Sequence, residues 1–512
     1  MARGATLNTN RTGFDPKVTL DAVFRRNVLM RPGALALADP PDRINAIGGL
    51  PRQFNYAEAD VAVSRLARQF KAIGLPEQSL VAIQLPNTVE AVLTLLAVVR
   101  AGMVALPVPL LWRRSDLVTA LRDVAPRALI TMTRLVGEKR GDARPAETAC
   151  EVAAELFTLG FPCAFGPEPP DGIIPLDIDG YLTGEPETFA TARGISPDSL
   201  AIATFDASRE GPFPIARNHS QWLAAGFSIT MEANIASGDT IVATLPPSSL
   251  AGIASAMIPW LLTGGTLQLS HGFTPAVAAM APGGAHIAAP AIALPALIGG
   301  ENGGFSSAIA VHRGPENLGI DLSQLPCNAI VDMQTFGETG FTALRRIAKI
   351  MPAPIPVGEI SAPVDSDDAP IVIETRRLAD GTLAVRGAMV PGKALGINGH
   401  AAPAQLQFDV DNFVRTNLRC HASGGALVIE AMPDGIVQVG GLRFGLDEIA
   451  ARVEQALPGA QIVTTRDPVL GMRCVIEVSD AEQAAKALDE AGLSSVIIDS
   501  IRYWPQAMRA AG

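Results

Sequence analysis

The chain has 512 residues, of which 48% are hydrophobic and 18% are charged, and its formal net charge is −11. This length and hydrophobic content predict more than one globular domain with a large core, and they exclude a disordered protein. The negative charge argues against a nucleic-acid partner, which would require a basic surface.

Cysteine usage and the apolar segments indicate the cellular setting. The five cysteines are scattered without a C-x-x-C spacing, which favours reduced thiols and a cytoplasmic location. Residues 1–16 lack the apolar core of a signal peptide. The apolar stretch 89–99 is too short to span a membrane, and the stretch 252–269 is broken by Pro259. We therefore expect no membrane span.

The first third of the chain alternates amphipathic helices with short strands. Apolar residues recur at four- and three-residue steps from Ala59 to Ile73, which predicts a helix over 54–74 that ends at Gly74. Asn87 and Glu90 have the spacing of a capping box and open a buried helix to Gly102. Further helices are expected at 19–31 and 113–124, and strands at 34–38, 80–85, 105–108 and 128–132. This alternation predicts a parallel sheet with both faces covered.

Later segments are less regular. Residues 137–194 are rich in proline and acidic residues, and we expect an irregular surface segment there. A strand is expected at 239–245, and a hairpin of 371–378 with 383–387 turned by Asp380-Gly381. In the last part, strands are expected at 436–439, 461–464, 474–478 and 495–501, and helices at 446–457 and 481–491.

One segment, residues 197–222, predicts a strand (200–205), a turn-rich loop and a helix from Ser220. A loop between a strand and a helix N-terminus is suited to hold an anion. The segment resembles the phosphate loop of the AMP-forming acyl-CoA synthetase/ligase (adenylate-forming) superfamily, in which P-D-D-L-A precedes T-S-G-T-T-G-x-P-K-G and T-H-x-N follows. Upstream, Tyr56-Ala57-Glu58, Arg65-Leu66-Ala67 and Val81-Ala82-Ile83-Gln84-Leu85-Pro86-Asn87 match the family patterns L-T-Y-x-E-L, N-R-L-A and V-A-I-x-L-P-N.

The resemblance covers nearly the whole chain and implies the family's fold. We therefore expect the α/β class, with a large N-terminal domain of two α/β-layered sheet subdomains plus a β-rich subdomain. A small α+β C-terminal lid domain is expected to follow. The expected boundaries are 1–418 for the N-terminal domain, 419–434 for a hinge and 435–512 for the C-terminal domain.

Residues at the implied phosphate site depart from the family. Ala207-Ser208-Arg209-Glu210-Gly211 stands where the family has S-G-T-T-G, and Phe213-Pro214 or Pro214-Ile215 replaces P-K. A loop that folds over a triphosphate needs small residues, hydroxyl donors and a cation. Ser208, Arg209 and Gly211 are the remaining candidates for contact with phosphate, whereas Asp206 and Glu210 bring negative charge.

The implied adenine and magnesium sites are altered as well. The family's Y-G-x-T-E, which stacks adenine, contacts phosphate and holds Mg²⁺, reads Phe336-Gly337-Glu338-Thr339-Gly340. Phe336, Gly337 and Thr339 are therefore candidate nucleotide contacts, with a core position as the alternative for Phe336. Glu338 is the candidate Mg²⁺ ligand if the loop is re-threaded. The family's G-G-A-P appears as His312-Arg313-Gly314-Pro315, where Gly314 faces a purine or the larger residues fill its space.

The ribose and hinge motifs show the same kind of change. Asn417 stands where the G-D of the family's R-T-G-D would begin. A ribose would therefore meet an amide in place of a carboxylate. In the hinge motif, Met432 replaces an arginine and Gln438 a lysine, while Arg443 is retained. The family's C-terminal catalytic lysine has no counterpart, because no lysine follows Lys486; Arg509 is the single candidate substitute. We therefore assign no catalytic residue.

The resemblance also implies the acyl side of the site. Ser249 and Gly252 stand in place of P-x-x-H-x-x-G, and residues 287–298, with Pro290, match a family helix that helps line the acyl pocket. His219 follows Asn218 as the family's T-H does, and a structural role is the alternative to a substrate contact. His271, His286, His400 and His421 show no metal-ligand spacing.

Two functions follow from this pattern. The first is an ATP-dependent acid–CoA ligase, which forms an acyl-adenylate and uses ATP, Mg²⁺ and CoA. The second, which we favour, is a pseudoenzyme of the family that binds an acyl group, an acyl-CoA or another acyl thioester, because each lost catalytic group costs several kcal/mol in the transition state. Divergent chemistry in the same cleft is a third reading. The expected partners are a small carboxylic acid or acyl-CoA, and an acyl-carrier protein or biosynthetic enzyme.

Overall fold

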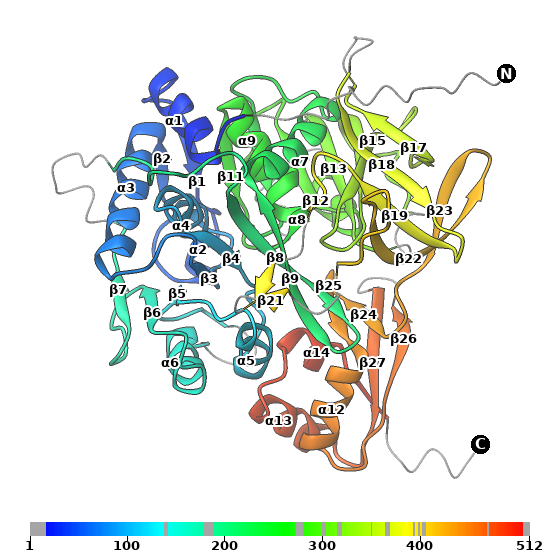
Figure 1. Ribbon diagram of the computed structural model, residues 1–512. Helices are drawn as coiled ribbons and strands as arrows, with labels where there is room; N and C mark the ends of the chain where they lie inside the picture. The colour runs from blue at the N-terminus through cyan, green and yellow to red at the C-terminus, as the bar shows by residue number, and fades with distance from the viewer. Residues whose placement is uncertain are drawn as a thin grey trace.

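The computed structural model describes residues 17–137, 142–178, 189–272, 280–299, 304–314, 320–349, 351–363, 369–392, 395–397, 400–401, 406–467 and 471–504. Within them, two mostly parallel sheets, one antiparallel sheet and a small C-terminal sheet organise the chain (Figure 1).

The largest sheet has eight strands, of which the inner six are parallel and the two outermost are antiparallel to their neighbours. Its spatial order is β15 (Phe341–Arg345), β14 (Cys327–Thr335), β13 (Phe305–His312), β12 (His286–Pro290), β10 (Thr240–Ala243), β11 (Thr266–Leu269), β1 (Leu35–Ala38) and β2 (Gln53–Asn55).

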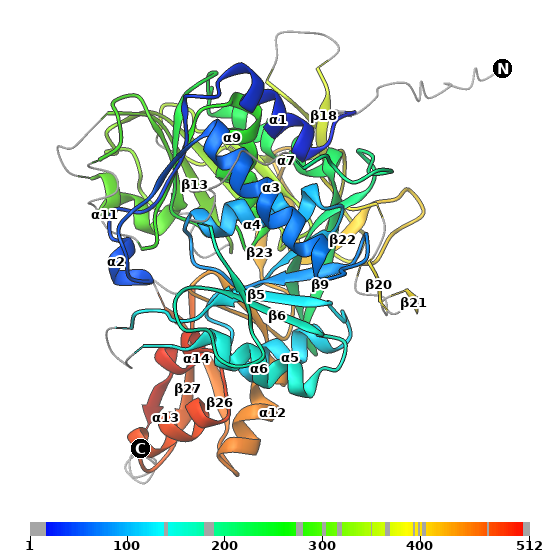
Figure 2. The same cartoon turned by 90° about the vertical axis from the view of Figure 1, so that its left-hand side faces the viewer.

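The second sheet has seven strands and is parallel except for its last strand. Its order is β7 (Ile174–Leu176), β6 (Phe161–Phe165), β5 (Ala128–Met132), β3 (Leu80–Ile83), β4 (Val104–Pro107), β8 (Leu200–Ser208) and β9 (Gly211–Asn218). Figure 2 shows α5 (Arg114–Arg122) and α6 (Pro145–Glu155) below this sheet, and α3 (Tyr56–Ala72) and α4 (Val89–Arg100) above it. The predicted parallel sheet with both faces covered is confirmed.

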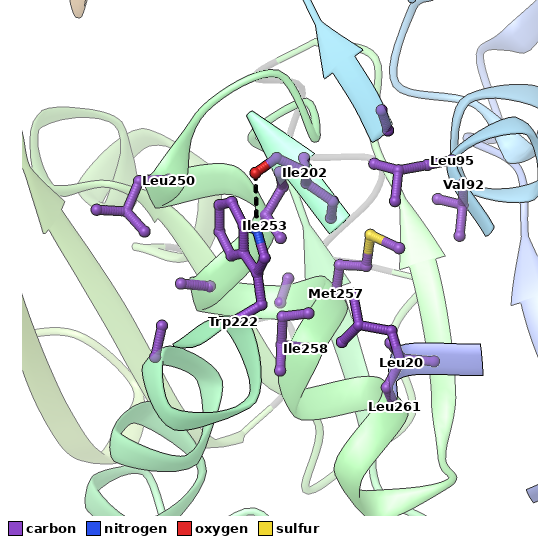
Figure 3. Packing of buried hydrophobic residues seen from close by; sticks show 14 of the residues in the cluster. Leu20, Val92, Leu95, Ile202, Trp222, Leu250, Ile253, Met257, Ile258 and Leu261 are labelled. Carbon is purple, nitrogen blue, oxygen red and sulfur yellow. Dashed lines mark hydrogen bonds between the residues drawn. The ribbon is translucent and has the colours of Figure 1, made fainter. Parts of the chain in front are cut away.

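Helices between the two sheets carry the main core. They are α1 (Leu20–Met30), α3, α4, α7 (His219–Glu232) and a continuous helical run over 250–263, made of α8 (Leu250–Gly252), a π-helical turn (Ile253–Met257) and α9 (Ile258–Thr263). Trp222 lies at the centre, fully buried, and its Nε1 donates a hydrogen bond to the carbonyl oxygen of Ile202 at 3.1 Å (Figure 3). Gly226 lets α7 approach this run, because a Cβ there would lie 2.3 Å from Ile258.

The remaining sheets complete the fold. The antiparallel six-stranded sheet has the order β16 (Ile355–Pro356), β23 (Ala426–Ala431), β22 (Val414–Ser423), β19 (Thr382–Arg386), β18 (Ile371–Arg377) and β17 (Gly358–Ser361). The C-terminal sheet has β25 (Leu442–Gly445), β24 (Ile436–Val439), β27 (Gly471–Glu477), β26 (Ile462–Asp467) and β28 (Arg502–Trp504), packed with α12 (Leu446–Ala456), α13 (Ala481–Glu490) and α14 (Ser495–Ser500). Short elements are α2 (Arg43–Ala46), a 3-10 turn (Ala291–Ala293), α11 (Leu294–Ile298), and β20 (Gly396–Ile397) paired with β21 (His400–Ala401).

The predicted fold class is confirmed, with two layered sheets, a β-rich part and a small α+β part. All five cysteines are free. In the described residues, the helices are too short or too polar to cross a bilayer.

Several local predictions are wrong. Residues 137–194 are not irregular throughout, because α6, β6 and β7 lie within them, and β6 and β7 extend the sheet by pairing next to β5. The strand expected at 495–501 is helix α14 (Ser495–Ser500). Most of 287–298 is strand β12 and a 3-10 turn, so the expected helix is reduced to α11. At 495–501, local apolar content did not distinguish strand from helix.

The expected capping box at Asn87 is also wrong. The side chain of Asn87 donates to the carbonyl oxygens of Ala243 and Ser270, at 2.9 and 2.8 Å, and so joins the two large sheets. The expected hinge over 419–434 is largely the β22–β23 hairpin, which leaves residues 432–435 as the connection to β24.

His219 holds α1 in place. It is 1% exposed, and its Nδ1 accepts a hydrogen bond from the backbone N–H of Leu20 at 3.1 Å. That N–H belongs to the first turn of α1 and has no partner within the helix. Burial lowers the pKa of His219 to about 4, so the ring is neutral and can accept this bond.

Replacing Trp222 by alanine should lower the free energy of unfolding by about 3–5 kcal/mol, because it empties a large volume in the core. Urea unfolding followed by far-UV circular dichroism measures this change. Phe157→Ala is the matched control, because Phe157 is 95% exposed and a surface change should cost less than about 0.5 kcal/mol. Equal losses in the two variants would contradict the packing described here.

Acidification should destabilise the protein through His219. Because the folded state favours the neutral ring, this contribution is complete above pH 6.5 and is lost as the pH falls towards about 4. The stability difference between wild type and His219→Gln should therefore shrink over this range, by at most about 3 kcal/mol. Unfolding curves at several pH values provide the measurement, and parallel profiles for the two proteins would refute the assignment.

Candidate functional site

The candidate site is a cleft where the ends of β8, β13 and β14 meet the β24–β25 turn, and we call it the central cleft. The side chains that define it are Asp206, Ser249, Arg313, Glu338 and Arg443, together with Gly441. It leaves about 40 Å³ of space, whereas pockets for small ligands occupy roughly 300–1,000 Å³. The cleft is therefore filled by the chain's own side chains.

The predicted phosphate loop is a β-hairpin, so the expected strand–loop–helix is wrong. Strand β8 runs on to Ser208 and pairs with β9 in antiparallel register, with Ser208 opposite Gly211 and a two-residue turn between them. Pro212 and Pro214 lie within β9, which is tolerated because β9 is an edge strand. Proline in this stretch had suggested a loop.

The tip of this hairpin rests on the C-terminal sheet. Arg209 Nε lies 2.5 Å from Asp447 Oδ2, at the start of α12. The Ser208 hydroxyl donates to the carbonyl oxygen of Gly211 within the hairpin, at 2.9 Å. A Cβ at Gly445 would lie 2.5 Å from the carbonyl oxygen of Ser208. The expected phosphate contacts Ser208, Arg209 and Gly211 thus take part in internal and interdomain contacts.

Glu338 occupies the N-terminus of the helical run over 250–263. Its Oε2 accepts a hydrogen bond from the backbone N–H of Leu250 at 2.5 Å. The positive end of a helix is an ordinary binding site for an anion. Burial and the nearby carboxylate of Asp206 raise the pKa of Glu338, although Arg313 opposes them. The anion site is therefore taken by a side chain of the protein.

Asp206 fixes the loop that carries Glu338. Its Oδ2 accepts a hydrogen bond from the backbone N–H of Glu338 at 2.8 Å, and its Oδ1 lies 3.5 Å from Arg443 Nη1. Gly337, at φ +64°, passes so close that an added Cβ would be 2.0 Å from Asp206 Oδ2. This glycine is needed for the close approach of the acid.

Arg313 closes the other side of the cleft. Its Nη2 donates to Ser249 Oγ at 2.6 Å, and its Nη1 donates to the carbonyl oxygen of Gly441 at 2.7 Å. Arg443 returns a hydrogen bond to the carbonyl oxygen of Arg313 at 3.1 Å. Burial lowers the pKa of Arg313. These bonds join the large domain to the β24–β25 turn across the cleft.

Arg217 holds the backbone of the loop that carries Glu338. It is fully buried and donates to the carbonyl oxygens of Met389 (2.9 Å), Glu338 (2.5 Å) and Thr339 (2.7 Å). Its guanidinium lies 5.3 Å from the ring centre of Trp222. Burial lowers the pKa of Arg217 to about 10, which still leaves it charged at neutral pH. Sequence reasoning missed this residue; an arginine within an apolar edge strand was the available signal.

The space expected for adenine is filled by side chains of the protein. Phe336 is completely buried in the main core and is not free to stack on a base, so its core alternative holds. His312 is 2% exposed and lies 2.7 Å from Asp332, which also pairs with Arg346. Beside Gly314 only about 10 Å³ remains, the space of a single water molecule.

The arrangement does not suit Mg²⁺ at Glu338. Three arginines, 217, 313 and 443, surround this carboxylate and Asp206, and they already supply its countercharge. Gly340, which stands in the position of the family's metal ligand, faces Ile373 and Val390. Among the described residues, no group of three or more His, Cys, Asp or Glu side chains is arranged to hold a metal.

The remaining predicted residues lie apart. Asn417 belongs to β22, and its side chain is outside the described part, as are Pro315 and Arg509. Gln438, in place of the family's lysine, is 2% exposed, and its Oε1 has no hydrogen-bond partner.

Of the expected acyl contacts, Ser249 alone lines the central cleft. His219 has the structural role described above, which corrects the expected substrate contact. At Gly252 an added Cβ would lie 2.0 Å from the carbonyl oxygen of Pro246, so this glycine serves packing. Pro290 ends β12.

Residues 24–197 match the family model described as AMP-binding enzyme. Glycine betaine reductase ATRR of Emericella nidulans is 32% identical over 128 residues, which are 25% of this chain and 9% of that protein. 3-Hydroxybenzoate–CoA ligase of Aromatoleum sp. is 25% identical over 250 residues, which are 47% of this chain and 43% of that protein. The chain thus matches less than half the length of either relative.

Similarity in fold extends further. The structure of o-succinylbenzoate CoA synthetase (MenE) from Bacillus subtilis superposes with a TM-score of 0.67 at 14% identity, covering 96% of this chain and 95% of that one. By sequence, residues 24–197 therefore match the AMP-binding enzyme family, and by fold nearly the whole chain is similar to o-succinylbenzoate CoA synthetase.

Proposed function

We propose that this chain is a non-adenylating member of the superfamily, which binds an acyl group or an acyl thioester without activating an acid with ATP. One observation carries the proposal. The carboxylate of Glu338 accepts the hydrogen bond of Leu250 N–H at the helix N-terminus, where an incoming phosphate would otherwise bind.

Electrostatics support this reading. Two like unit charges 4 Å apart repel by about 4 kcal/mol at an effective dielectric constant of 20. A polyphosphate in the central cleft would meet both Glu338 and Asp206. The arginines nearby reduce this repulsion, but Arg217 and Arg313 already donate hydrogen bonds to backbone carbonyls and to Ser249, which limits their use as phosphate ligands.

Movement of the C-terminal domain would not free the cleft. Of the charged side chains that fill it, Arg443 alone belongs to the C-terminal sheet, whereas Asp206, Arg313 and Glu338 belong to the large domain. Since Glu338 bonds to Leu250 and Asp206 within that domain, these contacts persist if the C-terminal domain rotates.

The proposed acyl ligand is inferred from sequence similarity to a CoA ligase. The named activity of the Aromatoleum relative is joining 3-hydroxybenzoate to CoA, and we extend the acyl or acyl-thioester class, not that substrate, to this chain. An acyl-carrier protein or a biosynthetic enzyme is the partner that fits such a ligand.

ATP–pyrophosphate exchange should stay at background with a panel of fatty and aromatic acids, because the cleft excludes the triphosphate. The measurement is incorporation of labelled pyrophosphate into ATP, with an active acid–CoA ligase as positive control. Exchange that depends on one acid would establish the alternative, an ATP-dependent acid–CoA ligase.

Removing the charge of Glu338 should reopen the anion site. In calorimetry, wild type should bind a medium-chain or aromatic acyl-CoA and give no measurable ATP–Mg²⁺ binding. Glu338→Gln keeps the shape of the side chain and should strengthen ATP binding at least tenfold, which corresponds to about 1.4 kcal/mol of relieved repulsion.

The matched control is Glu147→Gln, which removes an exposed acid on α6 that pairs with Arg144. It should leave both titrations unchanged. Tight ATP binding by wild type, without binding of acyl-CoA, would reverse the proposal.

A further inference from the structure

A second, larger cavity lies away from the central cleft and shares no lining residue with it. It opens between residues 43–52 and the carboxyl ends of β5, β6 and β7, and we call it the β5–β7 cavity. Its volume is about 660 Å³, within the roughly 300–1,000 Å³ of small-molecule pockets. The crevice outside the carboxyl ends of parallel strands is the usual ligand position in open α/β sheets.

A buried ion network forms the inner end of this cavity. Arg43 is 3% exposed; its Nη1 donates to Asp39 Oδ2 at 2.6 Å and to Glu90 Oε2 at 2.9 Å. Arg52 Nη2 donates to Glu90 Oε1 at 2.8 Å. Arg43 Nε is buried without a hydrogen-bond partner, and such a donor is costly unless an acceptor reaches it.

Of the two arginines in this network, Arg52 is the accessible one. The side chain of Arg52 is 25% exposed, whereas those of Glu90 and Asp39 are at most 1% exposed. Arg134 also lines the cavity, with a side chain 60% exposed, and its Nε lies 2.5 Å from Asp142. A ligand entering the cavity would therefore meet Arg52, Arg134 and the exposed Asp177 before it met the buried carboxylates.

The opposite wall is apolar. Met132, Phe165, Leu176 and Ile178 line the cavity from the strand ends, and Leu50, which is 80% exposed, lines it from the facing segment. Each apolar side chain that a ligand covers contributes roughly 25 cal/mol of binding free energy per Å² of apolar surface removed from water. The cavity thus pairs an apolar body with an end that carries arginine side chains.

We propose that the β5–β7 cavity binds a small amphipathic monocarboxylate, with its carboxylate at Arg52 and its apolar body against Met132 and Phe165. The planar guanidinium matches a carboxylate in geometry and charge. A single negative charge fits better than a polyphosphate, because four carboxylates, those of Asp39, Glu90, Asp142 and Asp177, already outnumber the three arginines at or beside the cavity. This site is independent of the function proposed for the central cleft.

Calorimetry with benzoate and octanoate tests the proposal, with benzamide as the neutral analogue and inorganic phosphate as a second anion. Both carboxylates should bind, with benzamide and phosphate at least tenfold weaker. Arg52→Gln should weaken benzoate binding at least tenfold, since Glu90 keeps its bonds to Arg43. Ile47→Trp, which fills the cavity from the facing segment, should abolish binding; circular dichroism checks that both variants fold.

Two controls place the ligand. Arg114→Gln changes an exposed arginine on α5 and should leave benzoate affinity within twofold of wild type, as should Arg122→Gln on the same helix. Loss of benzoate binding in either control variant but not in Arg52→Gln or Ile47→Trp would overturn the proposal, as would equal binding of phosphate and benzoate or the absence of binding to wild type.

Discussion

The buried guanidinium of Arg217 is the constraint on which the centre of this protein depends. A charge withdrawn from water must be met by hydrogen bonds, and Arg217 finds them on the carbonyl oxygens of Glu338, Thr339 and Met389. These bonds tie edge strand β9 to the β14–β15 turn and to the six-stranded sheet. The β14–β15 turn is thereby held in the position from which the side chain of Glu338 reaches the central cleft.

That placement decides the chemistry of the cleft. Glu338 meets the positive end of a helix, Asp206 meets the backbone of Glu338, and Arg313 and Arg443 complete the balance of charge. Asp206, Arg313 and Glu338 thus all bond to partners within the chain. The fold is similar to that of a CoA synthetase, and the polar interior of this chain is a network that joins the two domains through Gly441 and Asp447.

Much of the fold was predictable because local sequence and burial agree. The alternation of helices and strands up to Met132, the hairpin turned by Asp380-Gly381, and helices α12 and α13 all follow apolar periodicity and turn residues. Predictions failed where a non-local partner overrides that pattern. Asn87 has the spacing of a helix cap, yet it joins two sheets; Pro212 and Pro214 suggest a loop, yet an edge strand accepts them.

For the candidate site, the sequence by itself determined which chemical groups are present: no small-residue phosphate loop, a glycine at position 340, and acids at positions 206 and 338. It could not determine where those acids lie, because hydrogen bonds between residues more than 80 positions apart have no local signature. Tertiary structure alone decided that Glu338 caps a helix, that Arg217 holds its loop, and that a cavity opens at Arg52. The physical reason is that a buried charge is positioned by whichever partners the folded chain brings within hydrogen-bond reach.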